Sequence, residues 1–234
     1  MRPLLAELHA HTTWSDGELS LRALVDLYGR QGFDVLSVTD HALADGSGNG
    51  SVGVHNWREY LDEVEHEAGR AEREYGLLLI PGLELTDNHE EPLRAAHALA
   101  IGLHSYVSVE LGLRTAVLDA RRAGAAIVAA HPHAPGENSR GTCRWWHERD
   151  APAIRPDRYE LFNRRDVFAW VAERDLPCVA TGDFHCVEHL RTWKTLLPCA
   201  KEERAVVDFL RSDARAYLMP FSGAAQSGAE RAAA

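Results

Sequence analysis

The residues of this chain that could do chemistry begin with two histidines near its start. His9 and His11 follow an apolar segment that begins at Leu4, in a pattern typical of a β-strand. Alternate side chains of a strand point to the same face, so both imidazoles can reach one ion. Asp16 lies in the next turn and adds a carboxylate. Imidazole and carboxylate groups at this spacing predict a site for a divalent metal ion.

Further histidines and carboxylates stand at the ends or starts of other predicted strands. Apolar or alternating segments predict strands at 4–8, 34–39, 77–80, 97–103, 125–130, 159–162 and 177–181, and helices at 20–32, 57–75, 109–122, 167–174 and 201–210. Parallel strands joined by helices place their carboxyl ends at one rim, where such folds carry their sites. We therefore expect nine side chains to converge there: His9, His11, Asp16, His41, Glu84, His97, His131, Asp183 and His185.

The alternation of strands and helices predicts a mostly parallel sheet, and the number of strands suggests a small, irregular barrel. One strand pair should be antiparallel. Only about ten residues separate the strand before Glu84 from the strand that starts at His97, and a parallel crossover usually needs a dozen or more. The start of the second strand, with His97, should therefore lie beside Glu84.

The composition favours one large core. The chain has 234 residues, of which 45% are hydrophobic, so we expect a single domain over 1–221. Residues 222–234 are rich in Ala, Ser and Gly, and we expect them to form a disordered tail. The formal charge of −10 argues against nucleic acid as a partner, because a phosphate-binding surface needs excess Lys and Arg.

The four cysteines form no Cys-x-x-Cys pair, which indicates free thiols in a reduced compartment. The start of the chain has no apolar run typical of a signal peptide, and no 18-residue apolar stretch occurs. We therefore expect a soluble, cytoplasmic protein with no membrane partner. The sequence indicates no particular oligomeric state.

Taken in order, these motifs resemble those of the polymerase and histidinol phosphatase (PHP) superfamily of metal-dependent phosphoesterases. The motifs span residues 8–185, which is most of the chain: His9-Ala10-His11 with Ser15-Asp16-Gly17, Thr39-Asp40-His41, Gly82-Leu83-Glu84, His97 at a strand start, His131-Pro132, and Gly182-Asp183-Phe184-His185. The resemblance implies a distorted (β/α)7 barrel, an α/β fold similar to a TIM barrel.

The resemblance also implies a centre of two to three divalent ions. Mixed imidazole and carboxylate ligands without thiolate suit zinc, manganese or iron. By resemblance, the ligands divide into three sets: His9, His11, Glu84 and Asp183 for one ion; Glu84, His97 and His131 for a second; and Asp16, His41 and His185 for a third. Some relatives have histidine at the position of Asp16. A hydroxide held near Glu84, His131 and Asp183, with its pKa lowered toward neutrality, could attack phosphorus.

Three other side chains are candidate contacts for a substrate phosphate. Arg164 follows a predicted strand at the same rim, although an ion pair facing solvent is an alternative. Lys194 is a weaker candidate of the same kind. His133 is a third, although Pro132 could turn it to solvent, which the sequence slightly favours. The loops 42–56 and 134–157 are expected to border the substrate.

These features favour a metal-dependent phosphoesterase that acts on the phosphate monoester of a small metabolite. One alternative is a 3′ to 5′ exonuclease or nucleotide phosphodiesterase, against which the acidic charge and the lack of a basic stripe argue. Another is a non-catalytic, metal-binding regulatory module. The complete set of candidate ligands argues against that module, because a decayed site would be expected to have lost some of them.

Overall fold

The computed structural model describes residues 2–43, 50–136 and 141–223. Its strands are β1 (Leu4–Glu7), β2 (Val35–Ser37), β3 (His41–Leu43), β4 (Leu78–Ile80), β5 (Gly82–Asp87), β6 (Ala96–Ile101), β7 (Ala126–Ala130), β8 (Arg158–Asn163), β9 (Asp166–Val167), β10 (Cys178–Thr181), β11 (Trp193–Leu197) and β12 (Tyr217–Pro220). Its helices are α1 (Leu21–Arg30), α2 (Trp57–Tyr75), α3 (Leu113–Arg122), α4 (Arg144–His147), α5 (Ala169–Glu173) and α6 (Glu203–Arg211), with a 3-10 helix η1 (Val187–Leu190).

The strands form two sheets. One has the order β12-β11-β1-β2-β4, and the other has the order β10-β8-β7-β6-β5-β3, with β9 beside β8. The expected antiparallel pairing of β5 with β6 is confirmed, with Thr86 opposite His97. The prediction of a mostly parallel sheet is wrong, because β6–β7, β1–β11, β11–β12 and β8–β9 are antiparallel as well.

A mixed α/β fold is confirmed, but the described strands do not close into the expected (β/α)7 barrel. On one side β11, which was not predicted, pairs antiparallel with β1 along the edge that β10 would otherwise occupy, and on the other side β4 ends the first sheet and β3 the second. β1 and β10 therefore meet only beyond their ends, where Ala10 and Phe184 form an isolated parallel bridge. Two hydrogen bonds fix this bridge, from His11 N to Phe184 O at 2.8 Å and from Phe184 N to His9 O at 3.0 Å.

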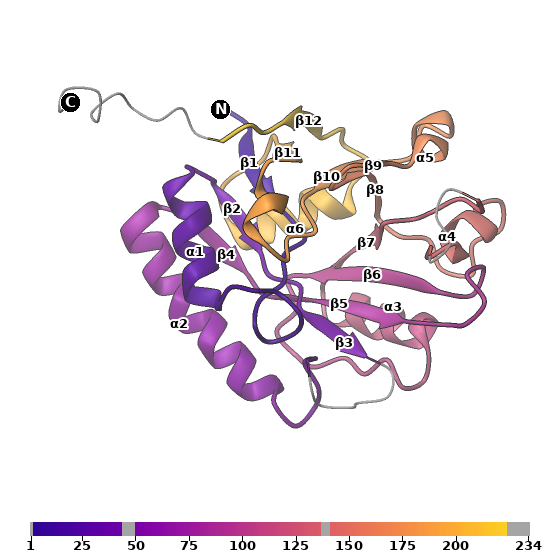
Figure 1. Cartoon of the computed structure of the whole chain (residues 1–234), viewed down its shortest axis with the longest axis horizontal. Coiled ribbons are helices and arrows are strands. Elements are labelled where there is room, and N and C mark those ends of the chain that lie inside the picture. Colours follow the sequence, from indigo (N-terminus) through magenta and orange to yellow (C-terminus); the bar gives the residue numbers. More distant parts are fainter. Residues whose placement is uncertain (1, 44–49, 137–140, 224–234) are drawn as a thin grey trace.

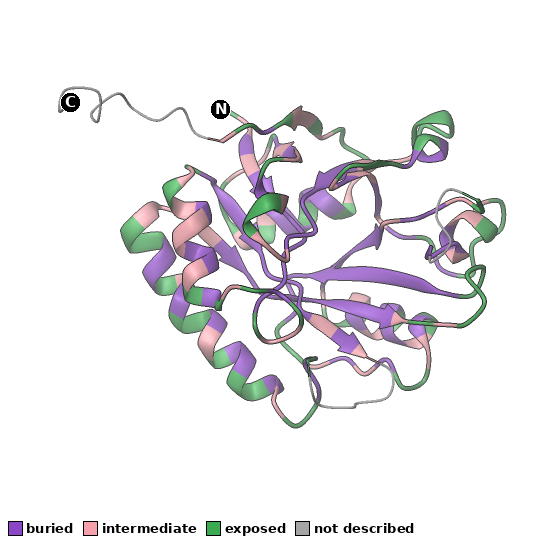
Figure 2. Cartoon of the chain, in the orientation of Figure 1, coloured by how far each residue is buried: buried purple, intermediate pink, exposed green. Residues whose placement is uncertain are grey.

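Two long helices cover one flank of the first sheet. Helix α1 begins at the N-cap Ser20, whose side chain accepts a hydrogen bond from Ala23 N, and α2 ends at Gly76, which has a φ of 59°. The two helices lie side by side in Figure 1. Figure 2 shows strands that are mostly buried and helices whose outer faces are exposed. The strands therefore provide rigid, buried positions for the side chains at their ends.

Several details differ from the sequence-based expectation. Helix α5 is shorter than predicted because Asp166–Val167 forms β9, and α4 lies in a loop that was expected to be irregular. All four cysteines are free, as expected. Within the described ranges, no helix is both long and apolar enough to cross a membrane. Residues 224–234 of the expected tail lie outside the described residues, as do 44–49 and 137–140 of the two expected substrate loops.

We predict that Arg158→Met destabilises the fold by about 3 kcal/mol. The guanidinium of Arg158 is buried and donates hydrogen bonds to the carbonyls of Phe209, Leu210, Ser212 and Ala214, at the end of α6. Methionine would leave all four carbonyls without this donor, two of them in fully buried hydrogen bonds. Urea unfolding measures the change. Arg204→Met, at an exposed position of α6, is the control, and equal free energies of unfolding for the two variants would contradict the prediction.

Candidate metal centre

The structure brings together all nine side chains that the sequence singled out as metal ligands. They come from seven segments of both sheets: His9 and His11 follow β1, Asp16 lies in the next turn, His41 starts β3, Glu84 is in β5, His97 is in β6, His131 follows β7, and Asp183 and His185 follow β10. Glu84 lies at the centre of the group and is 1% exposed.

One oxygen of Glu84 faces the two histidines that follow β1. Glu84 Oε2 lies 3.5 Å from His9 Nε2 and 3.4 Å from His11 Nε2, and the two nitrogens are 3.0 Å apart. Donor atoms that bind one ion at about 2.0 to 2.2 Å lie about 3.0 to 3.5 Å from one another. Asp183 Oδ1 lies 3.4 Å and 3.5 Å from the same two nitrogens. His9, His11 and Glu84 can therefore share one metal ion, with Asp183 beside them.

The other oxygen of Glu84 faces two further histidines. Glu84 Oε1 lies 3.0 Å from His97 Nδ1 and 3.1 Å from His131 Nε2. His41 also approaches this carboxylate, with its Nδ1 3.0 Å from Oε2, and His41, Glu84 and His97 form a second group that could hold a metal. Glu84 can thus bridge two ions, one on each oxygen.

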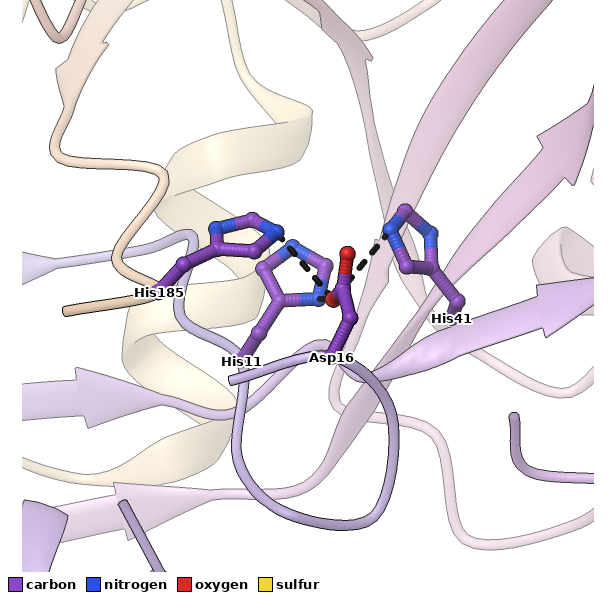
Figure 3. Close-up of side chains that lie close together, drawn as sticks. All are labelled: His11, Asp16, His41 and His185. Atoms are coloured by element: carbon purple, nitrogen blue, oxygen red, sulfur yellow. Dashed lines mark ion pairs between the residues drawn. The ribbon is translucent and has the colours of Figure 1, made fainter. Parts of the chain in front are cut away.

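A third group contains Asp16, whose carboxylate points between His185 and His41 (Figure 3). Asp16 Oδ1 is 3.1 Å from His185 Nε2, 3.6 Å from His41 Nε2 and 3.7 Å from His11 Nδ1. The group contains the three expected residues and also His11. The side chain of Asp16 is 54% exposed, so solvent reaches this part of the centre more easily than it reaches Glu84.

The electrostatics of the centre suit a divalent cation. Burial alone would raise the pKa of the carboxyl groups of Glu84 and Asp183, but the surrounding histidines lower it well below its usual value. Burial lowers the pKa values of His11 and His97, whereas for His9, His41 and His131 the neighbouring carboxylates outweigh burial and raise the pKa. Bound ligands are ionised carboxylates and neutral imidazoles, so a metal ion would replace the protons that these carboxylates attract. The donor set therefore fits the ions that the resemblance implies.

Glu160 is a functional residue that the sequence reasoning missed. Its carboxylate is fully buried and accepts hydrogen bonds from four donors: His9 Nδ1 at 2.8 Å, Thr181 Oγ1 at 2.6 Å, His131 N at 2.6 Å and Asn163 Nδ2 at 2.7 Å. A proton fixed on Nδ1 of His9 leaves the lone pair of Nε2 free to bind a metal. The sequence signal that could have identified Glu160 is a glutamate within the apolar strand β8. A buried carboxylate is rare unless it is paired, so such a residue indicates specific partners.

Other polar side chains orient the remaining imidazoles in the same way. Thr142 Oγ1 is 3.0 Å from His131 Nδ1 and Asn88 Oδ1 is 3.0 Å from His97 Nε2, and in both rings the other nitrogen faces Glu84. Thr86 Oγ1 is 2.8 Å from His41 Nδ1, which also faces Glu84, while Nε2 of this ring faces Asp16. The ring orientations are thus fixed by the protein itself.

Asp40 holds the turn that carries Asp16. Its carboxylate accepts hydrogen bonds from Thr12 N, Thr12 Oγ1 and Ser15 Oγ at 2.7 to 2.9 Å. The turn closes tightly, since a Cβ at Gly17 would lie 2.4 Å from the carbonyl oxygen of His11. Only glycine fits there, which explains the Ser-Asp-Gly sequence of this turn.

Backbone strain is concentrated at the same place. Among the described residues, four that are not glycine have positive φ angles, and three of them belong to the centre or its edge: His131 at 27°, Arg164 at 50° and Asp183 at 41°. Such conformations cost of order 1–3 kcal/mol each and persist only where surrounding contacts impose them.

Arg164 lies at the edge of the centre, as the sequence predicted. Its Nη2 is 3.1 Å from Asp183 Oδ1 and 2.7 Å from His185 Nδ1, and its Nε donates to the carbonyl oxygen of Asp183 at 2.9 Å. The side chain is 35% exposed, so its guanidinium is accessible to an anion at the opening.

The structure contradicts one expectation for each of the other two candidate phosphate contacts. Lys194 has no exposed side-chain surface and forms an ion pair with Glu7 at 2.6 Å, so it does not face the opening. Its strand, β11, was not predicted, and therefore its inward orientation was not foreseen. His133 is buried and packs edge-on against Phe168 with ring centroids 5.0 Å apart, so the expectation that it turns to solvent is wrong.

No family model matches the sequence, and no curated protein matches it. Several solved structures are similar to this chain. One is described as a two-domain protein containing a predicted PHP-like metal-dependent phosphoesterase, from Bacteroides vulgatus; it is 21% identical over 93% of this chain, with a TM-score of 0.66. This chain spans 65% of the length of that protein.

Another similar structure is an amidohydrolase from Chromobacterium violaceum with bound sulfate and no metal. It is 16% identical and covers 77% of this chain and 87% of its own, with a TM-score of 0.53. At these identities the likeness defines the fold. One of the chains that share this fold is described as PHP-like.

We predict that Glu160→Gln weakens the binding of a divalent metal about 10- to 100-fold. The amide cannot accept from all four donors, so the His9 ring loses its fixed tautomer. Competition of Mn²⁺ or Zn²⁺ with a chromophoric chelator measures the affinity. Glu203→Gln, which neutralises the carboxylate partner of His104 away from the centre, should bind as the unaltered protein does. Equal affinities of both variants would show that Glu160 does not orient a ligand.

Proposed function

We propose that this chain is a metal-dependent phosphoesterase that hydrolyses the phosphate monoester of a small metabolite. The observation that carries the proposal is Glu84, a buried carboxylate with imidazole nitrogens 3.0 to 3.5 Å from each of its two oxygens. Such an arrangement suits a carboxylate that bridges two divalent ions, which is a recurring feature of enzymes that displace groups at phosphorus.

The proposed ligand sets divide the nine side chains among two to three ions of zinc, manganese or iron. One ion would be held by His9, His11, Glu84 and Asp183, a second by Glu84, His97 and His131, and a third by Asp16, His41 and His185. When bound, such ions supply Lewis acidity and an activated water for attack at phosphorus. The three carboxylates of these sets do not fully neutralise three divalent ions, so the loaded centre would attract a phosphate dianion despite the acidic chain.

The side chains of this protein have separate tasks in the proposed reaction. Glu160 and Thr86 keep imidazoles oriented, and the buried positions of His9 and Glu84 exclude bulk water from the deep part of the centre. Arg164, at the opening, would bind a phosphate oxygen through its guanidinium. The metal-binding groups near Asp16 are the more accessible ones, and so the substrate would enter from that side.

We also propose that residues 1–221 form one domain whose two sheets are an opened form of the (β/α)7 barrel. The bridge between Ala10 and Phe184 supports this view, since it links the strands that would close such a barrel at the rim that carries the ligands.

The direct test is hydrolysis of an aryl phosphate monoester and of the matching diester after loading with Mn²⁺ or Zn²⁺. We expect monoester turnover, and His11→Ala and Asp183→Ala should lower kcat at least about 100-fold because each removes a proposed ligand. Circular dichroism should show that both variants remain folded. His104→Ala, at an exposed histidine outside the centre, is the control.

The other outcomes are equally informative. Preference for the diester would favour a nucleotide phosphodiesterase or exonuclease. Binding of metal without turnover of either ester would favour a regulatory module. Unchanged kcat in either ligand variant would refute the proposed centre.

We predict that Arg164→Ala mainly raises KM for the monoester, with kcat changed only a few-fold. The guanidinium would bind the phosphate in the ground state and in the transition state alike, so its loss acts on binding. Arg204→Ala, at an exposed arginine of α6, should leave both constants unchanged. A loss of kcat at constant KM would instead mean that Arg164 acts through Asp183, which it contacts at 3.1 Å.

A further inference from the structure

A fully buried ion pair lies directly beneath the candidate centre. Lys194 Nζ and Glu7 Oε2 are 2.6 Å apart, and neither side chain has exposed surface. The ammonium also donates to Thr192 Oγ1 at 2.7 Å. Neither charged group faces the opening, so neither can contact a substrate.

The carboxylate of Glu7 connects the two chain segments that carry the deepest candidate ligands. Glu7 Oε1 accepts a hydrogen bond from the backbone N–H of His9 at 3.2 Å and from that of Gly182 at 2.9 Å. Glu7 Oε2 accepts from the hydroxyl of Tyr28 at 3.2 Å. The glutamate thus ties the segment after β1 to the segment after β10, directly beside His9 and Asp183.

The ion pair also fits closely against the turn that carries Asp183. A Cβ at Gly182 would lie 2.5 Å from Glu7 Oε2 and 2.5 Å from Lys194 Nζ, so the glycine backbone rests on both charged groups. The next residue, Asp183, has a φ of 41°, a conformation that side chains rarely adopt and that must be imposed from outside. The ion pair is in position to impose it.

We propose that Glu7 and Lys194 are positioning residues for the metal centre: the carboxylate fixes the backbones of His9 and Gly182, and the ammonium fixes the carboxylate. The inference rests on the proposed function, since it assigns a task toward the same centre. A contribution to stability alone is a poor explanation for the pair, because the desolvation free energy of two buried charges often exceeds the free energy of their attraction. Lys194 also neutralises Glu7, so that the pair adds no net charge beneath the ligands.

The test compares Mn²⁺ affinity with stability in matched variants. The affinity is measured by electron paramagnetic resonance of free Mn²⁺, and the stability by the Tm of the metal-free protein. Lys194→Met and Glu7→Gln should each weaken Mn²⁺ binding about ten-fold or more, because the turn of Asp183 is no longer held. The control is Glu67→Gln, which alters a buried ion pair with Arg70 within α2, on the side where Arg70 contacts α1. Glu67→Gln should lower the Tm of the metal-free protein and leave its Mn²⁺ affinity unchanged.

The double variant Glu7→Gln/Lys194→Met separates the effect on positioning from the effect on stability. It also tests the proposal if Lys194→Met alone does not fold. Removing both charges together should recover Tm relative to Lys194→Met, while Mn²⁺ binding stays weak because the amide nitrogen in place of Oε2 cannot accept the hydrogen bonds from Gly182 N and the Tyr28 hydroxyl. Recovery of both properties, or wild-type affinity in the single variants, would overturn the inference alone. Failure of the unaltered protein to bind Mn²⁺ would overturn the proposed function and this inference with it.

Discussion

The buried carboxylate of Glu84 is the constraint on which the rest of the site depends. An ionised carboxylate in a protein interior is costly unless it is paired or binds a metal. Here it lies among five imidazoles, which are supplied by β3, β6 and the segments after β1 and β7. These segments come from both sheets, and so the position of one side chain requires the two sheets to meet at this rim. A divalent cation would compensate its charge directly.

Around this centre, a set of buried acidic residues holds the ligands without contacting the opening. Glu160 fixes the ring of His9, Asp40 fixes the turn of Asp16, and Glu7 fixes the backbone on either side. Each accepts several hydrogen bonds, which is why each can remain buried. The left-handed backbone of His131 and Asp183 is maintained in the same way, by contacts from neighbouring strands rather than by local preference.

The candidate ligands could be predicted from the sequence because they follow apolar strands at fixed spacings, and His97 could be placed beside Glu84 from the length of the connection alone. The open arrangement of the two sheets could not be predicted from the sequence. Strand β11 carries Lys194 within a segment whose alternation is weak, so neither the strand nor its pairing with β1 was predicted. Because β11 was not predicted, the expectation that Lys194 contacts the substrate phosphate was also wrong. The residues that orient the ligands could not be predicted because tertiary contacts decide their partners; Glu160, for example, lies 151 residues from His9 in the chain.

The central claim, that this constellation is a metal centre bridged by Glu84, is tested most directly by a crystal structure of the Mn²⁺-loaded protein with anomalous scattering measured at the manganese edge. The account predicts anomalous peaks within bonding distance of both oxygens of Glu84, with His9 and His11 nitrogens on one ion and His97 or His131 on the other. An ordered centre with no anomalous peak beside Glu84 would contradict it.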